Sequence, residues 1–145
     1  MMKNFKKILL AEDNPKDAEL ILLALQQSNL LNDVVRVKDG AQALDYLFKR
    51  AEFSGRDDDN PIVALIDLKM PKVDGLQVIR EIKSDEKLKT IPTVVLTSSR
   101  EEKDLIESYK LGINAYVVKP VEFEKFADTV KNVGVFWALI NEPPV

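Results

Sequence analysis

The chain has 145 residues, 46% of them hydrophobic and 31% charged, which is typical of a folded domain with a sizeable core. Its 21 Lys and Arg against 24 Asp and Glu give a formal net charge of −3, which does not favour nucleic-acid binding, since that usually requires a basic stripe. The sequence contains no cysteine and no histidine, which excludes disulfides, thiol nucleophiles, Cys- or His-ligated metals, Ser-His-Asp catalysis and a histidine phosphodonor.

The first half of the chain alternates short apolar runs with helical patterns. The runs "KILLA" (7–11) and "DVVRV" (33–37) predict strands. Asn14 followed by Pro15 predicts a helix start, and the helix is expected to run to about Ser28. Its buried face is expected to carry Ala18, Ile21, Leu22 and Leu25. The segment "GAQALDYLFKR" (40–50) predicts a second helix, followed by a polar loop, "AEFSGRDDDNP". Its inward residues are expected to be Ala43, Leu44, Leu47 and Phe48.

The second half continues the alternation. "IVALI" (62–66) reads as a strand buried on both faces, and "TVVLTSS" (93–99) and "AYVV" (115–118) predict two more. The helices between them are marked by Leu76, Ile79 and Ile82 and by Leu105, Ile106 and Tyr109. A long last helix is expected over about 121–140. Five strands alternating with five helices predict an α/β domain with a doubly wound, flavodoxin-like parallel sheet of order 2-1-3-4-5 and helices on both faces.

One domain over residues 1–145 is expected, because no repeat, low-complexity tract or linker interrupts the pattern. No apolar run has the length of a membrane span, and "MMKNFKKILLAEDN" becomes acidic too early for a signal peptide. We therefore expect a cytoplasmic protein with no membrane partner.

Acidic residues follow two strands that the expected order makes neighbours. Glu12 and Asp13 leave the first strand, and Asp67 leaves the third. In a doubly wound sheet these ends share one edge, where ligands bind. Each pair of carboxylates would repel by roughly 3 kcal/mol at ~5 Å and an effective dielectric of ~20. A hard divalent cation relieves that repulsion, and an open, hydrated octahedral site favours Mg²⁺.

Two further side chains are expected at the same edge. The fourth strand brings the hydroxyl of Thr97, with Ser98 beside it, and the fifth brings the ammonium group of Lys119. Acids, a hydroxyl and a lysine around one aspartate indicate a phosphoryl-transfer site. Asp67 would attack phosphorus, the metal and Lys119 would hold two oxygens, and Thr97 would bond the third.

Four motifs in order carry a resemblance to a known family. "LLAEDN", "LIDLKMPKVDG", "VVLTSS" and "AYVVKP" closely resemble the response-regulator receiver domains of bacterial two-component signalling, the CheY-like family, from about Lys7 to Asn132. "SDEKLKTIP" and "VGVFWALINEPP" further resemble the small stand-alone regulators that serve bacterial phytochrome kinases. The resemblance implies a sensor histidine kinase, in the narrower match a phytochrome, as the phosphodonor.

The resemblance also implies roles for individual residues. Asp67 would be the phosphoacceptor, Asp13 a direct Mg²⁺ ligand, Glu12 a ligand through water, and the backbone carbonyl of Lys69 a further ligand. Thr97 and Tyr116 fall on the switch pair of the family. The Lys119–Pro120 peptide bond is expected to be cis.

Other interpretations of these residues remain open. Asp13 alone would serve as a helix cap, although Asn14 already fills that position, and Thr97, Lys119 and Tyr116 would each be ordinary structural residues in isolation. A phosphatase of the haloacid dehalogenase type uses a similar set, but it needs a second acid two residues after the nucleophile, where this chain has Lys69. A receiver-like scaffold that binds without phosphorylation is the third alternative.

The last helix is more apolar than an outer-layer helix requires. A core-facing stripe is formed at helical spacing by Phe123, Phe126, Ala127, Val130, Val133 and Trp137. Four residues fall largely outside it: Val135, Phe136, Leu139 and Ile140. They either cap the core or form a patch for a two-fold homodimer. Because the sequence ends five residues after position 140, we expect no output domain and a signal that leaves through protein contacts.

Overall fold

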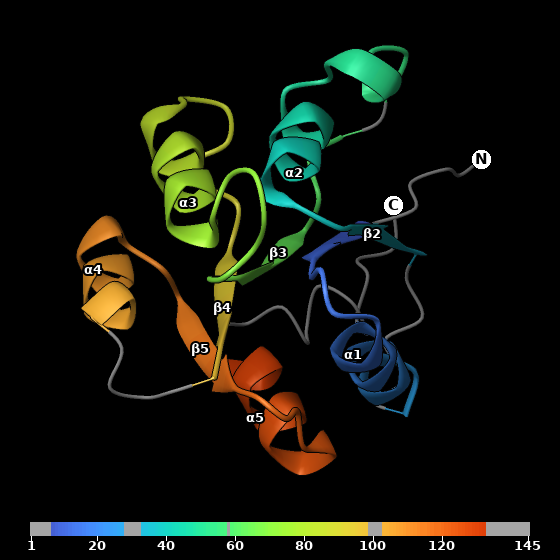
Figure 1. The fold of residues 1–145 in the computed structure, drawn as a ribbon, viewed down its shortest axis with the longest axis vertical. Helices are drawn as coiled ribbons and strands as arrows, with labels where there is room; N and C mark the ends of the chain where they lie inside the picture. The colour runs from blue at the N-terminus through green and yellow to red at the C-terminus, as the bar shows by residue number, and fades with distance from the viewer. Residues whose placement is uncertain (1–6, 28–32, 58, 99–102, 133–145) are drawn as a thin grey trace, which may run out of the picture.

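The protein is a five-stranded, all-parallel α/β domain with the strand order β2-β1-β3-β4-β5 (Figure 1). The structure, a computed structural model, describes residues 7–27, 33–57, 59–98 and 103–132. The strands are β1 (Lys7–Ala11), β2 (Asp33–Val37), β3 (Val63–Asp67), β4 (Thr93–Thr97) and β5 (Ala115–Val118). The helices are α1 (Pro15–Gln27), α2 (Gly40–Leu47), α3 (Gly75–Ser84), α4 (Lys103–Leu111) and α5 (Phe123–Asn132), with a 3-10 turn, η1 (Ala51–Phe53). The predicted fold class and strand order are confirmed.

Two layers of helices cover the sheet. Helices α1 and α5 lie on one face, and α2, α3 and α4 lie on the other (Figure 1). Successive residues of β1 therefore serve different cores: Ile8 and Leu10 pack with the α1 and α5 residues Ile21 and Phe126, whereas Leu9 packs in the α2 and α3 layer. A strand buried on both faces needs apolar residues at every position, which explains the uninterrupted apolar runs of the sequence.

Helix α1 begins as predicted but buries a different set of leucines. The side chain of Asn14 accepts hydrogen bonds from the backbone N–H groups of Lys16 and Asp17, at 2.9 and 3.0 Å, and so caps the helix. Leu22, expected in the core, is 38% exposed, and Ala24 is buried instead at 4%. The prediction was wrong here because hydrophobicity does not show which residue of a wide apolar stripe meets the sheet.

The segment after α2 is more ordered than its polar composition indicates. The helix ends at Leu47 rather than near residue 50, and Lys49 has φ 56° in the left-handed region. The expected loop contains η1, which places the half-buried ring of Phe53 5.2 Å from that of Tyr46 at an interplanar angle of 85°. Tyr46, absent from the predicted core, is 2% exposed, and this aromatic contact helps to cover it together with the guanidinium group of Arg56, 4.0 Å above the ring.

The last helix is described only in part. Its described portion starts at Phe123, two residues later than expected, and Phe126 is fully buried, as predicted. The four residues expected to form the dimer patch, Val135, Phe136, Leu139 and Ile140, lie outside the described residues. Within the described part of the chain, the structure contains no helix of the length and apolar character that a membrane span requires.

Candidate functional site

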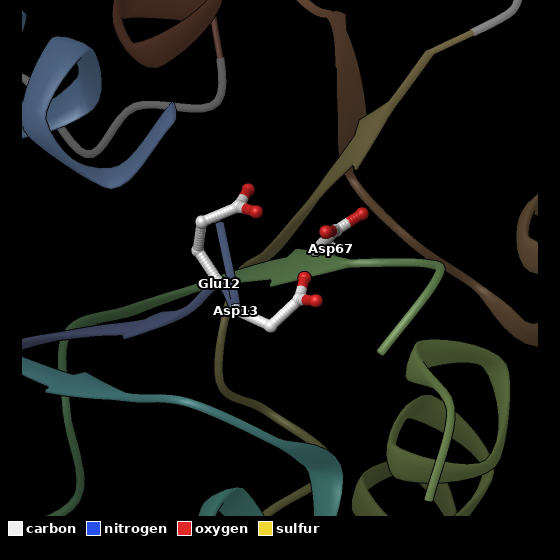
Figure 2. A group of neighbouring side chains, drawn as sticks. All are labelled: Glu12, Asp13 and Asp67. Atoms are coloured by element: carbon white, nitrogen blue, oxygen red, sulfur yellow. The ribbon is translucent and has the colours of Figure 1, made fainter. Parts of the chain in front are cut away.

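Three carboxylates meet at the carboxyl edge of the sheet. Glu12 and Asp13 directly follow β1, and Asp67 is the last residue of the neighbouring β3. Each offers a carboxylate oxygen, and these oxygens all lie within 4.8 Å of one another (Figure 2). The structure thus brings together the acids that the strand order predicted. One boundary differs, since β3 runs Val63–Asp67 rather than 62–66 and so includes the aspartate.

The three acids differ in their access to water. Glu12 is fully buried and Asp67 is 4% exposed, whereas Asp13 is exposed. Burial, and after it the charge of Asp67, raise the pKa of Glu12 to about 7, although the charge of Lys119 opposes the rise. Burial also raises the pKa of Asp67, although Lys119 acts in the opposite direction. The two buried acids are therefore costly to ionise, and a cation is needed to keep both charged.

Lys119 supplies a cation to this cluster. Its Nζ lies 3.2 Å from Oδ2 of Asp67, 3.3 Å from both carboxylate oxygens of Glu12 and 3.0 Å from Oδ2 of Asp17. Burial lowers the pKa of Lys119, but the hydrogen bond to Asp17 and the charges of the other acids outweigh it and raise the pKa overall. Lys119 is therefore a fixed ammonium group beside Asp67.

The backbone sets the position of this lysine. Its N–H donates to the carbonyl oxygen of Thr97 at 2.7 Å, just past the end of β5. The Lys119–Pro120 bond is cis, as the resemblance implied. Thr97, 1% exposed, ends the adjacent strand β4, so the expected hydroxyl and ammonium groups reach the same edge.

A small cavity opens onto these groups. It has a volume of about 160 Å³, and Asp67, Thr97, Lys119 and Asp13 line it, together with Asn14, Asp17, Leu68, Lys69 and Ser98. Tyr116, assigned to the switch pair, lies outside that lining and is one of the residues that line a separate groove of about 450 Å³ beside α5. Its half-buried ring packs edge-on against Tyr109 of α4, with ring centres 6.0 Å apart.

The segment after Asp67 shows why the motif ends in glycine. A Cβ atom at Gly75 would clash with the carbonyl oxygen of Asp67, so only glycine lets the start of α3 come this close to the strand. The N–H of Gly75 donates to the carbonyl of Leu68 at 2.9 Å, and that of Lys69 donates to Oδ1 of Asp67 at 3.2 Å. The turn therefore orients the aspartate, while the side chain of Lys69 is exposed.

Two residues of the site were not predicted. Asp17 contacts Lys119, and its only sequence signal was its place in the first turn of α1. Arg36 of β2 donates from Nε and Nη2 to the carbonyl oxygen of Glu12, at 3.1 and 3.0 Å, and from Nη2 to that of Asp13 at 3.3 Å. It fixes the backbone of both acids, a role that the strand pattern did not indicate.

The fold and this site are those of a regulatory receiver domain, and the chain belongs to the family described as the response regulator receiver domain, whose model matches residues 8–131. It is a response regulator of two-component signalling, homologous to phytochrome response regulators. The match sets aside the haloacid dehalogenase alternative.

Three relatives document this similarity. The bacteriophytochrome response regulator RtBRR is 54% identical to this chain, covers 97% of it and 85% of its own chain, and has a TM-score of 0.88. Response regulator Rcp1 from Synechocystis sp. is 36% identical over 91% of this chain and 88% of its own length. The phosphorylated cyanobacterial phytochrome response regulator RcpA is 38% identical, with a TM-score of 0.77 over 97% of this chain and 98% of its own.

The donor set fits a hard divalent cation. Rcp1 has also been solved in an Mn(2+)-bound form, which is 35% identical to this chain with a TM-score of 0.78 over 97% of it and 99% of its own chain. Three clustered carboxylates offer the oxygen ligands that such ions prefer, and the exposed Asp13 leaves the cluster open to water. The cluster therefore has the donor set that a divalent-metal site requires.

Proposed function

We propose that Asp67 accepts a phosphoryl group from the phosphohistidine of a partner kinase. The observation that carries this proposal is the ammonium group of Lys119, 3.2 Å from the carboxylate of Asp67, at a cavity that also meets Thr97. One oxygen of Asp67 attacks phosphorus, the P–N bond of the phosphohistidine breaks, and the imidazole leaves with the bond electrons. The product is an acyl phosphate on Asp67.

The surrounding residues divide the work of this transfer. Lys119 neutralises one phosphoryl oxygen, and the hydroxyl of Thr97 bonds another as charge develops. Glu12, Asp13 and the carbonyl group of Lys69 would hold Mg²⁺ together with Asp67. When bound, the ion supplies positive charge for the acids and the phosphoryl oxygens. In this way the protein assists its own phosphorylation and, with water as the attacking group, its dephosphorylation.

The proposal requires a second protein as donor, because the chain has no histidine. RtBRR and RcpA are by name phytochrome response regulators, which supports a phytochrome-type sensor histidine kinase as that partner. The proposal carries over the cytoplasmic location expected from the sequence, and it includes neither nucleic acid nor a membrane. The signal passes on through protein contacts, with Thr97 and Tyr116 as the groups that respond to phosphorylation.

Labelling with acetyl phosphate tests the acceptor directly. In the presence of Mg²⁺, the intact mass of the protein should rise by one phosphoryl group, and Asp67→Asn should abolish the gain. Asp57→Asn, at an exposed acid, is the matched control and should label like the parent. Labelling of the Asp67→Asn protein to the same extent as the parent would falsify the assignment.

We extend the proposal to a homodimer formed by the last helix. It rests on the apolar sequence "VGVFWALI" (133–140), from which Val135, Phe136, Leu139 and Ile140 were predicted to form the patch. Phe136→Glu should be monomeric by light scattering at concentrations where the parent is dimeric, with unchanged circular dichroism. A parent that is monomeric both with and without acetyl phosphate rules this part out.

A further inference from the structure

We propose that Asp17 is the exchange partner of Lys119: it holds one N–H of the lysine in the resting protein and releases it to the phosphoryl group. Asp17 is thus a positioning residue that opposes phosphorylation. This inference rests on the proposed function of Asp67. It concerns a contact between the first turn of α1 and the end of β5 that the sequence analysis did not anticipate.

The geometry shows that the lysine is fully engaged before phosphorylation. An ammonium group has three N–H donors. Nζ of Lys119 contacts three carboxylates, and the contact with Asp17, at 3.0 Å, is shorter than those with Asp67, at 3.2 Å, and Glu12, at 3.3 Å. A phosphoryl oxygen on Asp67 therefore gains a bond from Lys119 only if one of these contacts is given up.

The burial of the three carboxylates identifies which of their contacts with Lys119 breaks most easily. The side chains of Glu12 and Asp67 are 0% and 5% exposed, whereas that of Asp17 is 26% exposed. A buried carboxylate that loses its cation stays unpaired in a poorly solvated place, which is strongly unfavourable. Asp17 instead has water at hand to replace the lysine. The contact of Lys119 with Asp17 is therefore the least costly of the three to break.

The position of Asp17 on α1 also lowers the cost of its release. Its backbone N–H donates to the capping oxygen of Asn14 at 3.0 Å, so it lies in the first turn. The helix N-terminus carries a partial positive charge that stabilises a carboxylate there. Asp17 also lines the same 160 Å³ cavity as Asp67 and Thr97, so its freed charge still faces the incoming phosphodonor. Removing this carboxylate should therefore help phosphorylation in two ways: it frees an N–H donor of Lys119, and it removes a negative charge that faces the phosphodonor.

The test compares initial rates of phosphorylation by acetyl phosphate, measured by intact mass at fixed Mg²⁺. Asp17→Asn should be labelled about threefold faster than the parent, or more, because a donor of Lys119 is freed. Asp17→Ala should behave in the same way. Glu19→Gln is the matched control, since it removes one charge from an exposed position of the same helix without touching Lys119. It should keep the parent rate.

A second measurement separates this role from a structural one. Damage to the fold would slow labelling and lower the melting temperature, whereas the exchange role predicts faster labelling by a protein that melts within about 2 °C of the parent. In a Lys119→Ala background, Asp17→Asn should accelerate labelling less than it does in the parent, because the part of its effect that acts through the lysine is lost.

Three results would overturn the inference. They are a rate for Asp17→Asn at or below that of the parent, an equal acceleration in Glu19→Gln, and an undiminished acceleration in the Lys119→Ala background. A parent that is not labelled at all would contradict the proposed function instead. A labelled parent combined with any of the three results would contradict only the role of Asp17.

Discussion

Ile66 and Asp67 are neighbours in β3 with nearly the same burial, 0% and 4% exposed, yet they belong to regions of opposite energetics. Ile66 packs in the apolar layer under α2 and α3, where burial is favourable. Asp67 stands at the carboxyl edge beside Glu12, where burial raises the cost of each charge. The contrast shows that burial in the sheet interior stabilises the fold, whereas burial of neighbouring acids at its carboxyl edge lowers the stability.

The largest effect is expected in the apolar layer. Ile66→Ala should lower the free energy of unfolding by about 2–5 kcal/mol, because the removed atoms leave a cavity among fixed neighbours. Urea denaturation of the purified protein measures it. Leu20→Ala, at a side chain that is 42% exposed, is the control and should change stability by much less. Equal losses for both variants would contradict the division into a stabilising interior and a solvated outer surface.

The carboxyl edge should respond to metal instead. Mg²⁺ at about 100 times its dissociation constant should stabilise the folded protein by about 2.7 kcal/mol, because the ion relieves repulsion among Glu12, Asp13 and Asp67. Thermal melting with increasing Mg²⁺ measures the shift. Asp13→Asn should bind the ion more weakly and be at least as stable as the parent without it. Melting curves of both proteins that ignore Mg²⁺ would remove the metal assignment.

The stability of the protein should also depend on pH through the acids of the carboxyl edge, whereas apolar side chains such as that of Ile66 do not titrate. The pKa of Glu12 is raised from 4.5 to about 7, so between these values the folded state binds more protons than the unfolded state. Stability without metal should therefore fall as pH rises from 5 to 8, on the order of 2 kcal/mol. The raised pKa of Asp67 acts in the same direction.

Glu12→Gln is the variant that checks this origin. It removes the titrating group while keeping the shape of the side chain, so its melting temperature should change less than that of the parent over the same pH range. Excess Mg²⁺ should also flatten the profile of the parent, because the ion favours the ionised acids. A parent that becomes more stable on going from pH 5 to pH 8 without metal would contradict the sign.

The sequence predicted what depends on strand order and missed what depends on contacts between elements. Glu12, Asp13 and Asp67 were placed together because parallel strands end at one edge, and Lys119 followed by the same rule. Asp17 and Arg36 were missed because their contacts depend on the long side chains of Lys119 and of Arg36 itself, whose direction no periodic pattern reveals.

The core shows the same limit. The apolar runs identified the strands, but on α1 Leu22 is exposed against expectation and Ala24, which was not expected in the core, is buried. A small residue at the seam lets a helix approach the sheet closely, and that choice is made by tertiary packing. Tyr46 is a second case, since Phe53 and Arg56, which help to cover it, lie in a segment that composition alone marked as loop.

The smallest expected effect lies at the rim of the site, where Lys69 is exposed while its N–H holds Oδ1 of Asp67 at 3.2 Å. Lys69 is one of the residues that line the cavity, and its side chain is long enough to lie over a phosphoryl group there and hinder attacking water. Lys69→Ala should then speed the loss of phosphate about threefold, a change of about 0.65 kcal/mol in the barrier. The decay of the phosphorylated mass after removal of acetyl phosphate measures it.

Lys72→Ala is the control for a general loss of positive charge. Lys72 is exposed, lies in the same loop as Lys69 and pairs with Asp39 at 3.7 Å. An unchanged or slower decay in Lys69→Ala would show that the rim does not shield the acyl phosphate and that the lifetime is set by the buried part of the site alone.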